Sequence, residues 1–266
     1  MPGDAAPDAM HAWAGARLPT RWPAPCRGTN RGAGLPLNSE LPGLDNPIWS
    51  CLATRHACIA LGGALARRYP VDISPLAGLP AAEATNLVAL TALVGVGDDV
   101  ALVGPHLPVL TDNWTTLHAS RVTQMLRASR SPLPEGGVEV EKLGPAAVDE
   151  MIELVELTKP GPFRRRTIEL GSYIGIRENG QLLAMAGERT WIGEHREVSA
   201  ICTHPEAQGR GYARALIGRV VNRMLRAGET PYLHVESANA RAIDLYLKLG
   251  FVRRTEFALL YAKRLR

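Results

Sequence analysis

The sequence predicts an α/β fold, and the pattern is clearest in its second half. After residue 137, strand-like alternation and helical apolar stripes follow one another. Asn179-Gly180 lies between two strand-like runs, which is a strong hairpin signal. Gly209 and Gly211 come just after a strand-like run and open a long amphipathic helix. The chain has 266 residues, of which 46% are hydrophobic, so one or two domains with a sizeable core are expected.

The first half is harder to interpret. Residues 1–45 are rich in Ala, Pro and Gly without apolar periodicity, so we expect a disordered tail there. Residues 46–133 have the apolar content of a folded unit. The elements expected there are a helix from Asn46-Pro47 through Leu61, two strands around a turn over Glu83–Val103, and a helix over Thr115–Arg130. Ser131–Gly137 has the composition of a linker, so 46–133 and 137–266 are predicted as separate units.

The second unit is predicted to follow the order β-α-β-β-β-α-β-α-β. Each helix shows an apolar stripe at i, i+3, i+4 spacing, and Gly228 and Gly250 mark the ends of two of them. The expected strands are Val138–Leu143, Tyr173–Arg177, Leu182–Trp191, Glu197–Thr203, Tyr232–Glu236 and Val252–Ala262; the expected helices start near Val148, Ala213 and Ala242.

Composition excludes several classes of protein. No apolar run reaches the roughly 18–20 residues of a membrane helix, so no membrane association is expected. The net charge of +4 comes from residues 137–266, which is too little for a nucleic-acid surface but suits an anionic small molecule. The four cysteines form no CxxC pair, so neither a metal site nor a disulfide framework is predicted, and a reduced cytoplasmic location fits.

The most informative segment runs from Ile201-Cys202-Thr203 through Gln208-Gly209-Arg210-Gly211-Tyr212-Ala213. The first amides of a helix lack intrahelical partners and lie at the positive end of its dipole, so this turn can bind a diphosphate. Arg214 replaces the third glycine of a dinucleotide fingerprint, and no Walker lysine follows. The alternative is a strand–helix turn with a purely structural role. Gln208-x-x-Gly211-x-Ala213 resembles the [Q/R]-x-x-G-x-[G/A] signature of the GNAT superfamily of N-acyltransferases, which cradles the pyrophosphate of coenzyme A.

A second block supports the same resemblance. Asn239 through Phe251 is similar to the family's N-x-x-A-x-x-x-Y-x-x-x-G-F helix, and the strand Glu197–Thr203 stands where the family receives pantetheine. The resemblance covers about residues 137–266. It implies the GNAT fold, a mixed and mostly antiparallel sheet flanked by helices, with residues 46–133 as a degenerate GNAT-like half that has no second glycine turn. Segments such as Gly171-Ser172-Tyr173 and Met185-Ala186-Gly187 resemble the glycine N-acyltransferase-like branch.

The resemblance also implies roles for individual residues. Coenzyme A would contact Ile201, Cys202, Thr203, the Gln208–Ala213 turn, Asn239 and Tyr246. Tyr246 is the candidate acid for the departing thiolate, although a core tyrosine would also fit its place on the apolar stripe. Glu197 is the candidate base, with Glu188 or a water chain as alternatives, and the amide of Cys202 is the candidate oxyanion donor. The Cys202 thiol is expected to be a small buried residue, and His234 a satisfied core histidine.

We therefore expect an N-acetyltransferase that moves an acetyl group from acetyl-CoA directly to an amine of a small molecule, amino acid or peptide. A non-catalytic acyl-CoA-binding sensor is the alternative from another functional class. The expected partners are acetyl-CoA and the acceptor, in a monomer or homodimer without nucleic acid.

Overall fold

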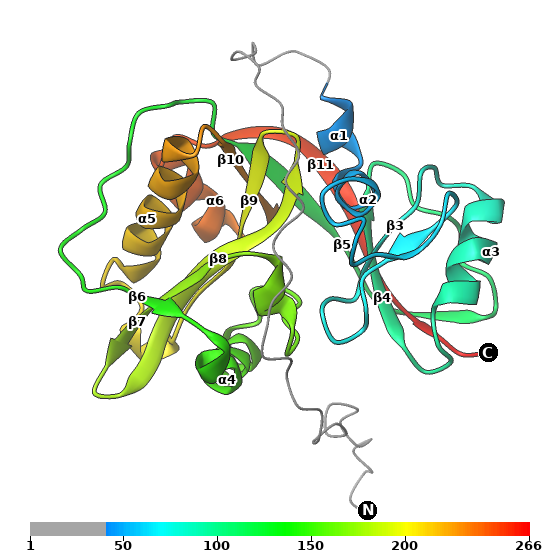
Figure 1. The fold of residues 1–266 in the computed structure, drawn as a ribbon, viewed down its shortest axis with the longest axis horizontal. Helices are drawn as coiled ribbons and strands as arrows, with labels where there is room; N and C mark the ends of the chain where they lie inside the picture. The colour runs from blue at the N-terminus through cyan, green and yellow to red at the C-terminus, as the bar shows by residue number, and fades with distance from the viewer. Residues whose placement is uncertain (1–40) are drawn as a thin grey trace, which may run out of the picture.

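The computed structural model describes residues 41–266, and they form one sheet of eleven strands with helices on both sides (Figure 1). The strand order is β1-β2-β3-β4-β11-β5-β10-β9-β8-β7-β6. Most neighbouring strands are antiparallel, and the pairs β3–β4 and β9–β10 are parallel. The predicted class, a mixed and mostly antiparallel sheet flanked by helices, is confirmed.

The part before the linker supplies five strands and three helices: α1 (Pro42–Asp45), α2 (Pro47–Ala53), β1 (Leu61–Gly62), β2 (Arg67–Arg68), β3 (Leu76–Gly78), α3 (Ala84–Leu93), β4 (Asp99–Gly104) and β5 (Trp114–Leu126). The predicted disordered tail lies, up to residue 40, outside the described residues, and its last four residues form α1.

The part after the linker has the predicted order, with one single strand at its end: β6 (Glu141–Leu143), α4 (Val148–Thr158), β7 (Tyr173–Glu178), β8 (Gln181–Ile192), β9 (His195–Thr203), α5 (Tyr212–Arg226), β10 (Thr230–Glu236), α6 (Ala240–Lys248) and β11 (Val252–Arg264). Asn179 and Gly180 have φ of 48° and 83°, as a tight hairpin between β7 and β8 requires. Short 3₁₀ turns occupy 145–147, 167–170 and 205–207.

Three sequence predictions in the first part are wrong. Thr115–Arg130 was expected to be a helix, but it contains β5, which is hydrogen-bonded to β10 on one side and β11 on the other. β5 is a central strand, and its last residues, 122–126, are buried on both faces of the sheet. This segment therefore lacks the alternation of buried and exposed residues that marks a half-buried strand. Within Glu83–Val103, the first predicted strand is instead α3, while the second is β4. The helix that begins at Pro47 ends at Ala53 and does not reach Leu61.

The last strand joins the two parts of the chain. β11 lies between β4 and β5, pairing with β4 over Asp99–Gly104 and with β5 over nearly its whole length. Both neighbours come from the sequence before the linker. The sheet therefore continues without a break across residues 46–133 and 137–266.

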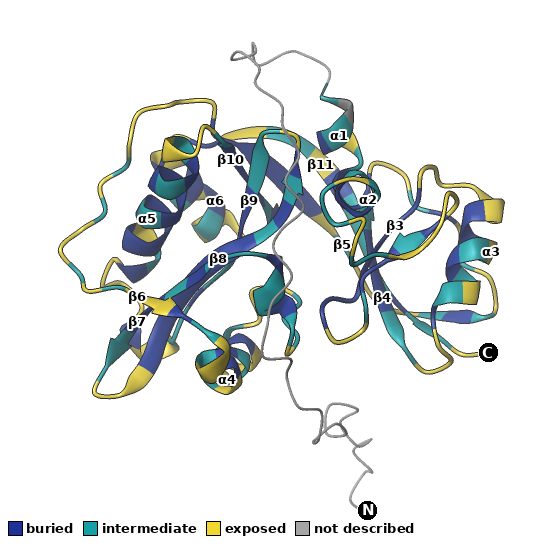
Figure 2. Ribbon diagram, viewed as in Figure 1, coloured by how far each residue is buried: buried dark blue, intermediate teal, exposed yellow. Residues whose placement is uncertain are grey.

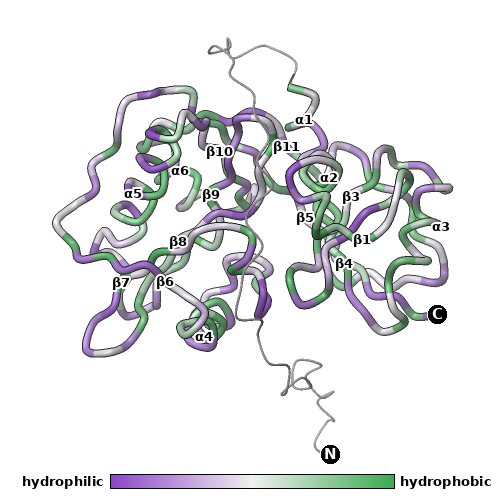
Figure 3. Tube along the Cα trace, in the orientation of Figure 1, coloured by the Kyte–Doolittle hydropathy of each residue, from purple (hydrophilic) through white to green (hydrophobic). Residues whose placement is uncertain are grey.

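The main core lies between the sheet and helices α5 and α6. Leu216, Ile217 and Val221 of α5 are fully buried against β8, β9 and β10. Figure 2 shows buried residues along the central strands and the inner side of α5, and Figure 3 shows apolar and polar residues sharing that helix, as expected of an amphipathic helix. The opposite face of the sheet carries α2, α4 and the chain between α4 and β7. The pocket is lined from both sides, by Ile48 of α2 and by Tyr246 of α6.

Candidate active site

The pocket opens where two parallel strands separate. The register of β9 with β10 ends at Glu197–Tyr232, and beyond it the strands diverge. A cavity of about 920 Å³ fills this space and extends from the glycine turn to the strands of the first part of the chain. The split leaves the backbone of Ser199–Thr203 without a strand partner on its β10 side. An extended ligand with amide groups can pair with this free edge.

A bulge in β9 sets the direction of that backbone. Ala200 has φ of 51°, and the register against β8 shifts between Met185 and Gly187. The amide of His204 donates to the carbonyl of Leu183 at 2.7 Å. In an antiparallel ladder, hydrogen-bonded pairs recur at every second residue, so the Cys202 amide faces β8 through its pairing with Met185. This direction argues against the Cys202 amide as the oxyanion donor.

The glycine turn presents an open helix N-terminus to the pocket. Gly209 and Gly211 have φ of 82° and 83°, a region that L side chains rarely adopt. Gly211 is the N-cap of α5, and no side chain caps the helix there. A Cβ at either glycine would meet no atom within 4 Å, so the space in front of the first amides is open. This cradle fits the pyrophosphate of coenzyme A, because α5 directs its dipole at that space.

Side chains around the turn are already partly engaged. Arg210 pairs with Glu178 at 3.0 Å and donates to the carbonyl of Glu206 at 3.1 Å. The Tyr212 hydroxyl also donates to Glu178. Gln208 accepts from Arg241 of α6 at 2.9 Å, which links the turn to α6. Arg210 is therefore held at the rim of the cradle. To bind an anion there, its guanidinium would have to give up part of its contact with Glu178.

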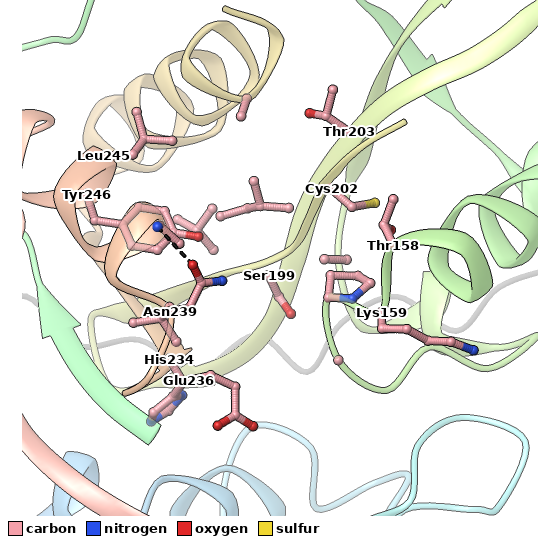
Figure 4. A pocket seen from close by; sticks show the side chains of 18 of the residues that line it. Thr158, Lys159, Ser199, Cys202, Thr203, His234, Glu236, Asn239, Leu245 and Tyr246 are labelled. Carbon is pink, nitrogen blue, oxygen red and sulfur yellow. Dashed lines mark hydrogen bonds between the residues drawn. The ribbon is translucent and has the colours of Figure 1, made fainter. Parts of the chain in front are cut away.

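Helix α6 brings Asn239 and Tyr246 to the same cavity (Figure 4). Asn239 caps α6, with its Oδ1 accepting from the Ala242 amide at 3.0 Å, so its side-chain amide remains available as a donor. Tyr246 is 7% exposed and lies edge-on to Phe251. Burial raises the pKa of Tyr246 to about 12, so the hydroxyl stays protonated at neutral pH and can act as an acid.

Glu197 is tied into a buried network. Arg189 donates to its two carboxylate oxygens at 2.7 and 3.0 Å, and Thr190 donates at 2.6 Å. Burial by itself raises the pKa of Glu197, but the Arg189 charge and hydrogen bonds from His234 and Arg189 outweigh it and hold that pKa well below its usual range. A carboxylate held in this way is a weak proton acceptor, so the geometry argues against Glu197 as the base.

The alternative carboxylate is equally engaged. Glu188 is 2% exposed at its side chain, and its two oxygens face Arg196, at 2.7 Å, and Arg223. Glu197 and Glu188 therefore neutralise arginines of β8, β9 and α5. Glu197, Glu188 and a water chain are the three candidate acceptors for the amine proton. Because both carboxylates are engaged by arginines, these contacts favour water in the open part of the pocket.

The two other candidates behave as structural residues. Burial raises the pKa of the Cys202 thiol to about 11, so no thiolate is present at neutral pH. His234 has both ring nitrogens engaged: Nδ1 faces Glu197 at 2.8 Å and Nε2 faces the Gln124 amide nitrogen at 3.1 Å. The Thr203 hydroxyl, which lines the pocket, is buried without a hydrogen-bond partner, as expected of a group that awaits a ligand.

Comparison with known proteins identifies the family. The Acetyltransferase (GNAT) family profile matches residues 146–251. A solved structure from Novosphingobium aromaticivorans, assigned to the GNAT family of acetyltransferases, is 32% identical, covers 83% of this chain and 98% of its own, and superposes with a TM-score of 0.76. The chain belongs to the GNAT acetyltransferase family. A GCN5-related N-acetyltransferase from Kribbella flavida shares the fold at 14% identity, with coverage of 84% and 96% and a TM-score of 0.55. No curated protein sequence gives a significant match.

GNAT proteins are acyltransferases, and the predicted family is thus confirmed. In residues 41–266 no helix is long and apolar enough to span a membrane. Over the same residues, no three His, Cys, Asp or Glu side chains gather as a metal site would require.

Sequence reasoning missed the far end of the pocket in this GNAT protein. Glu236 lines it from the end of β10, and Val103, Val122 and Leu259 line it from β4, β5 and β11. Glu236 is three residues before Asn239 and two after His234, so the sequence indicates its position at the end of the strand. The sequence does not indicate its neighbours in space, because the pairing of β10 with β5 joins residues more than a hundred positions apart.

Proposed function

We propose that this GNAT protein is an N-acetyltransferase that moves an acetyl group from acetyl-CoA directly to an amine of a small molecule, amino acid or peptide. One observation carries the proposal: a single cavity runs from the uncapped N-terminus of α5, past Tyr246, to a separate end lined by β4, β5 and β11. A site of this shape holds two substrates at once, which direct transfer requires.

The proposed coenzyme site uses the predicted residues. The amides of Gly209 to Ala213 would bind the diphosphate, and the free edge at Ile201 and Thr203 would pair with the pantetheine amides. The side-chain amide of Asn239 would add a donor from α6. Gln208 and Arg210 would form the rim, and the Cys202 and Tyr212 side chains would pack below.

The proposed chemistry needs a neutral amine, a donor for the developing oxyanion and an acid for sulfur. Tyr246 supplies the acid: its O–H bond breaks as the thiolate leaves, and the sulfur takes the proton. The oxyanion donor is an amide of β9 that faces away from β8, in place of Cys202. Glu197 is assigned a positioning role, because it orients Arg189 and His234, and the amine proton leaves through the open acceptor end.

The remaining expectations extend this proposal. Residues 46–133 would act as a packing and substrate-shaping partner, since their strands line the acceptor end. The glycine N-acyltransferase-like branch is the subgroup we propose within the GNAT family, on the segments noted in the sequence. A cytoplasmic monomer or homodimer completes the proposal. A sensor that binds acyl-CoA without turnover is the competing function, and it would share the cradle.

The test is calorimetric titration of acetyl-CoA into the full chain and into Gly211→Trp, whose indole would fill the cradle. Micromolar binding that this substitution abolishes supports the site. A thiol-release assay over an amine panel then separates the enzyme from the sensor, with Tyr246→Phe expected to lose turnover and keep acetyl-CoA affinity. Absence of acetyl-CoA binding by the unaltered protein would refute the proposal.

A further inference from the structure

The acceptor end of the pocket has an apolar floor made by one face of the sheet. The strand register pairs Val122 with Glu236 and Val103 with Leu259, and paired residues share a face. Ile48 of α2 and Leu76 of β3 line the same end. Ile48, Leu76 and Val122 are each at most 6% exposed, so this floor is a built part of the core rather than a surface patch.

The positive side chains around this floor do not pair with Glu236. Arg189 is bound by Glu197 through two of its nitrogens. Arg164 donates to both oxygens of Asp99 at 2.8 and 2.9 Å, which joins the chain after α4 to β4. Lys159, at the end of α4, is exposed and in Figure 4 extends away from Glu236. No arginine or lysine among the described residues is thus paired with Glu236.

Glu236 lines the pocket and, unlike the buried Glu197 and Glu188, has only weak partners. Its Oε1 accepts from the Ser120 hydroxyl at 3.0 Å, and the His118 ring nitrogen lies 3.9 Å from the same oxygen. Its Oε2 has no protein partner among residues 41–266, and the side chain is 44% exposed. A carboxylate that faces a cavity without a cation can receive one from a ligand.

We infer that the acceptor is a primary amine with an apolar body, whose ammonium is recognised by Glu236 and whose hydrocarbon lies on Val103, Val122 and Leu259. This inference rests on the proposed acetyl transfer. Glu236 takes one proton from the ammonium, which leaves the neutral amine, and passes it to solvent through its exposed side. The amine nitrogen then bonds to the acetyl carbon while the C–S bond breaks, and the sulfur takes the proton of Tyr246. The nitrogen releases its second proton to Glu236 as the amide forms, and Tyr246 regains a proton from solvent.

The same charges select against a free amino acid. Its carboxylate is attached to the carbon that bears the ammonium, so it would lie close to Glu236 and repel it. The side chains that form the floor, Val103, Val122 and Leu259, carry no positive charge to compensate. Neutralising that carboxylate as an amide removes the repulsion and keeps the ammonium and the side chain.

The test compares three acceptors of the same skeleton with the full chain and acetyl-CoA: 3-methylbutylamine, leucine and leucinamide. We expect kcat/KM for leucine to be at least about tenfold below that of the other two. Glu236→Gln should lower kcat/KM for 3-methylbutylamine about tenfold or more, by removing a charge-assisted hydrogen bond, while the Kd of acetyl-CoA stays unchanged. Glu256→Gln removes a carboxylate that faces Arg121 outside the pocket, and it should change neither value.

The results that would contradict the acceptor inference differ from the result that would contradict acetyl transfer. Leucine used as well as 3-methylbutylamine, or Glu236→Gln without effect, would overturn the inference and leave acetyl transfer standing. Binding of acetyl-CoA with no acetylation of any of the three amines would also overturn the acceptor class. Failure to bind acetyl-CoA would overturn the proposed function and the inference with it.

Discussion

Replacing Gly211 by alanine separates the ligand role of the glycine turn from its backbone role. Gly211 has φ of 83°, and Gly228 at the other end of α5 has φ of 78°. A Cβ at either position meets no atom within 4 Å. The two substitutions therefore impose the same strain and no clash, and only Gly211 faces the pocket.

The magnitudes follow from that geometry. A left-handed conformation costs an L residue about 1–2 kcal/mol, so both variants should lose that much free energy of unfolding. For a chain of this size, the corresponding fall in Tm is roughly 2–8 °C. Gly211→Ala should in addition weaken acetyl-CoA binding by about 10- to 100-fold, because its methyl group lies where the diphosphate approaches the α5 amides and breaks charge-assisted hydrogen bonds.

The assay is calorimetric titration of acetyl-CoA beside thermal unfolding of the three proteins. Gly228→Ala should show the stability loss with an unchanged Kd. If Gly211→Ala bound acetyl-CoA as tightly as the unaltered protein, the turn would have only a structural role and the reasoning would fail. An equal loss of affinity in Gly228→Ala would point to helix destabilisation instead.

Three further predictions concern the site. Tyr246→Phe should lower kcat about 10²- to 10⁴-fold with the Kd of acetyl-CoA unchanged. Because the pKa of Tyr246 is about 12, the unaltered enzyme should lose no activity through tyrosine ionisation between pH 7 and 10 in a thiol-release assay. Glu197→Gln should destabilise the fold by about 3–5 kcal/mol in urea unfolding, since it leaves Arg189 buried without its counter-charge. The folded-state pKa of Glu197 lies below the unfolded value, so its stabilisation is complete at neutral pH and is lost as the pH falls through the folded pKa; a Glu197→Gln loss that grew on acidification would contradict this. Asn239→Ala should cost about 1 kcal/mol through the cap of α6 and weaken acetyl-CoA binding, whereas Asn239→Ser should retain the stability.

Local signals explain why the second half could be predicted. The stripe of α5, the Asn179-Gly180 hairpin and the Asn239 cap each depend on residues within a few positions of one another. The same holds for the glycine turn, where positive φ and an uncapped helix start are properties of a short peptide. The residues proposed to contact coenzyme A could thus be named from sequence.

The sequence by itself determined the order of elements after the linker and the turn that opens α5. Tertiary structure alone decided that Thr115–Arg130 contains a strand, because pairing with β10 and β11 outweighs the local preferences of that segment. It also decided the states of the carboxylates: Glu197 and Glu188 are neutralised by arginines, and Glu236 is left facing the cavity. Sequence spacing gives no access to these contacts, since charge and burial depend on which distant strands become neighbours.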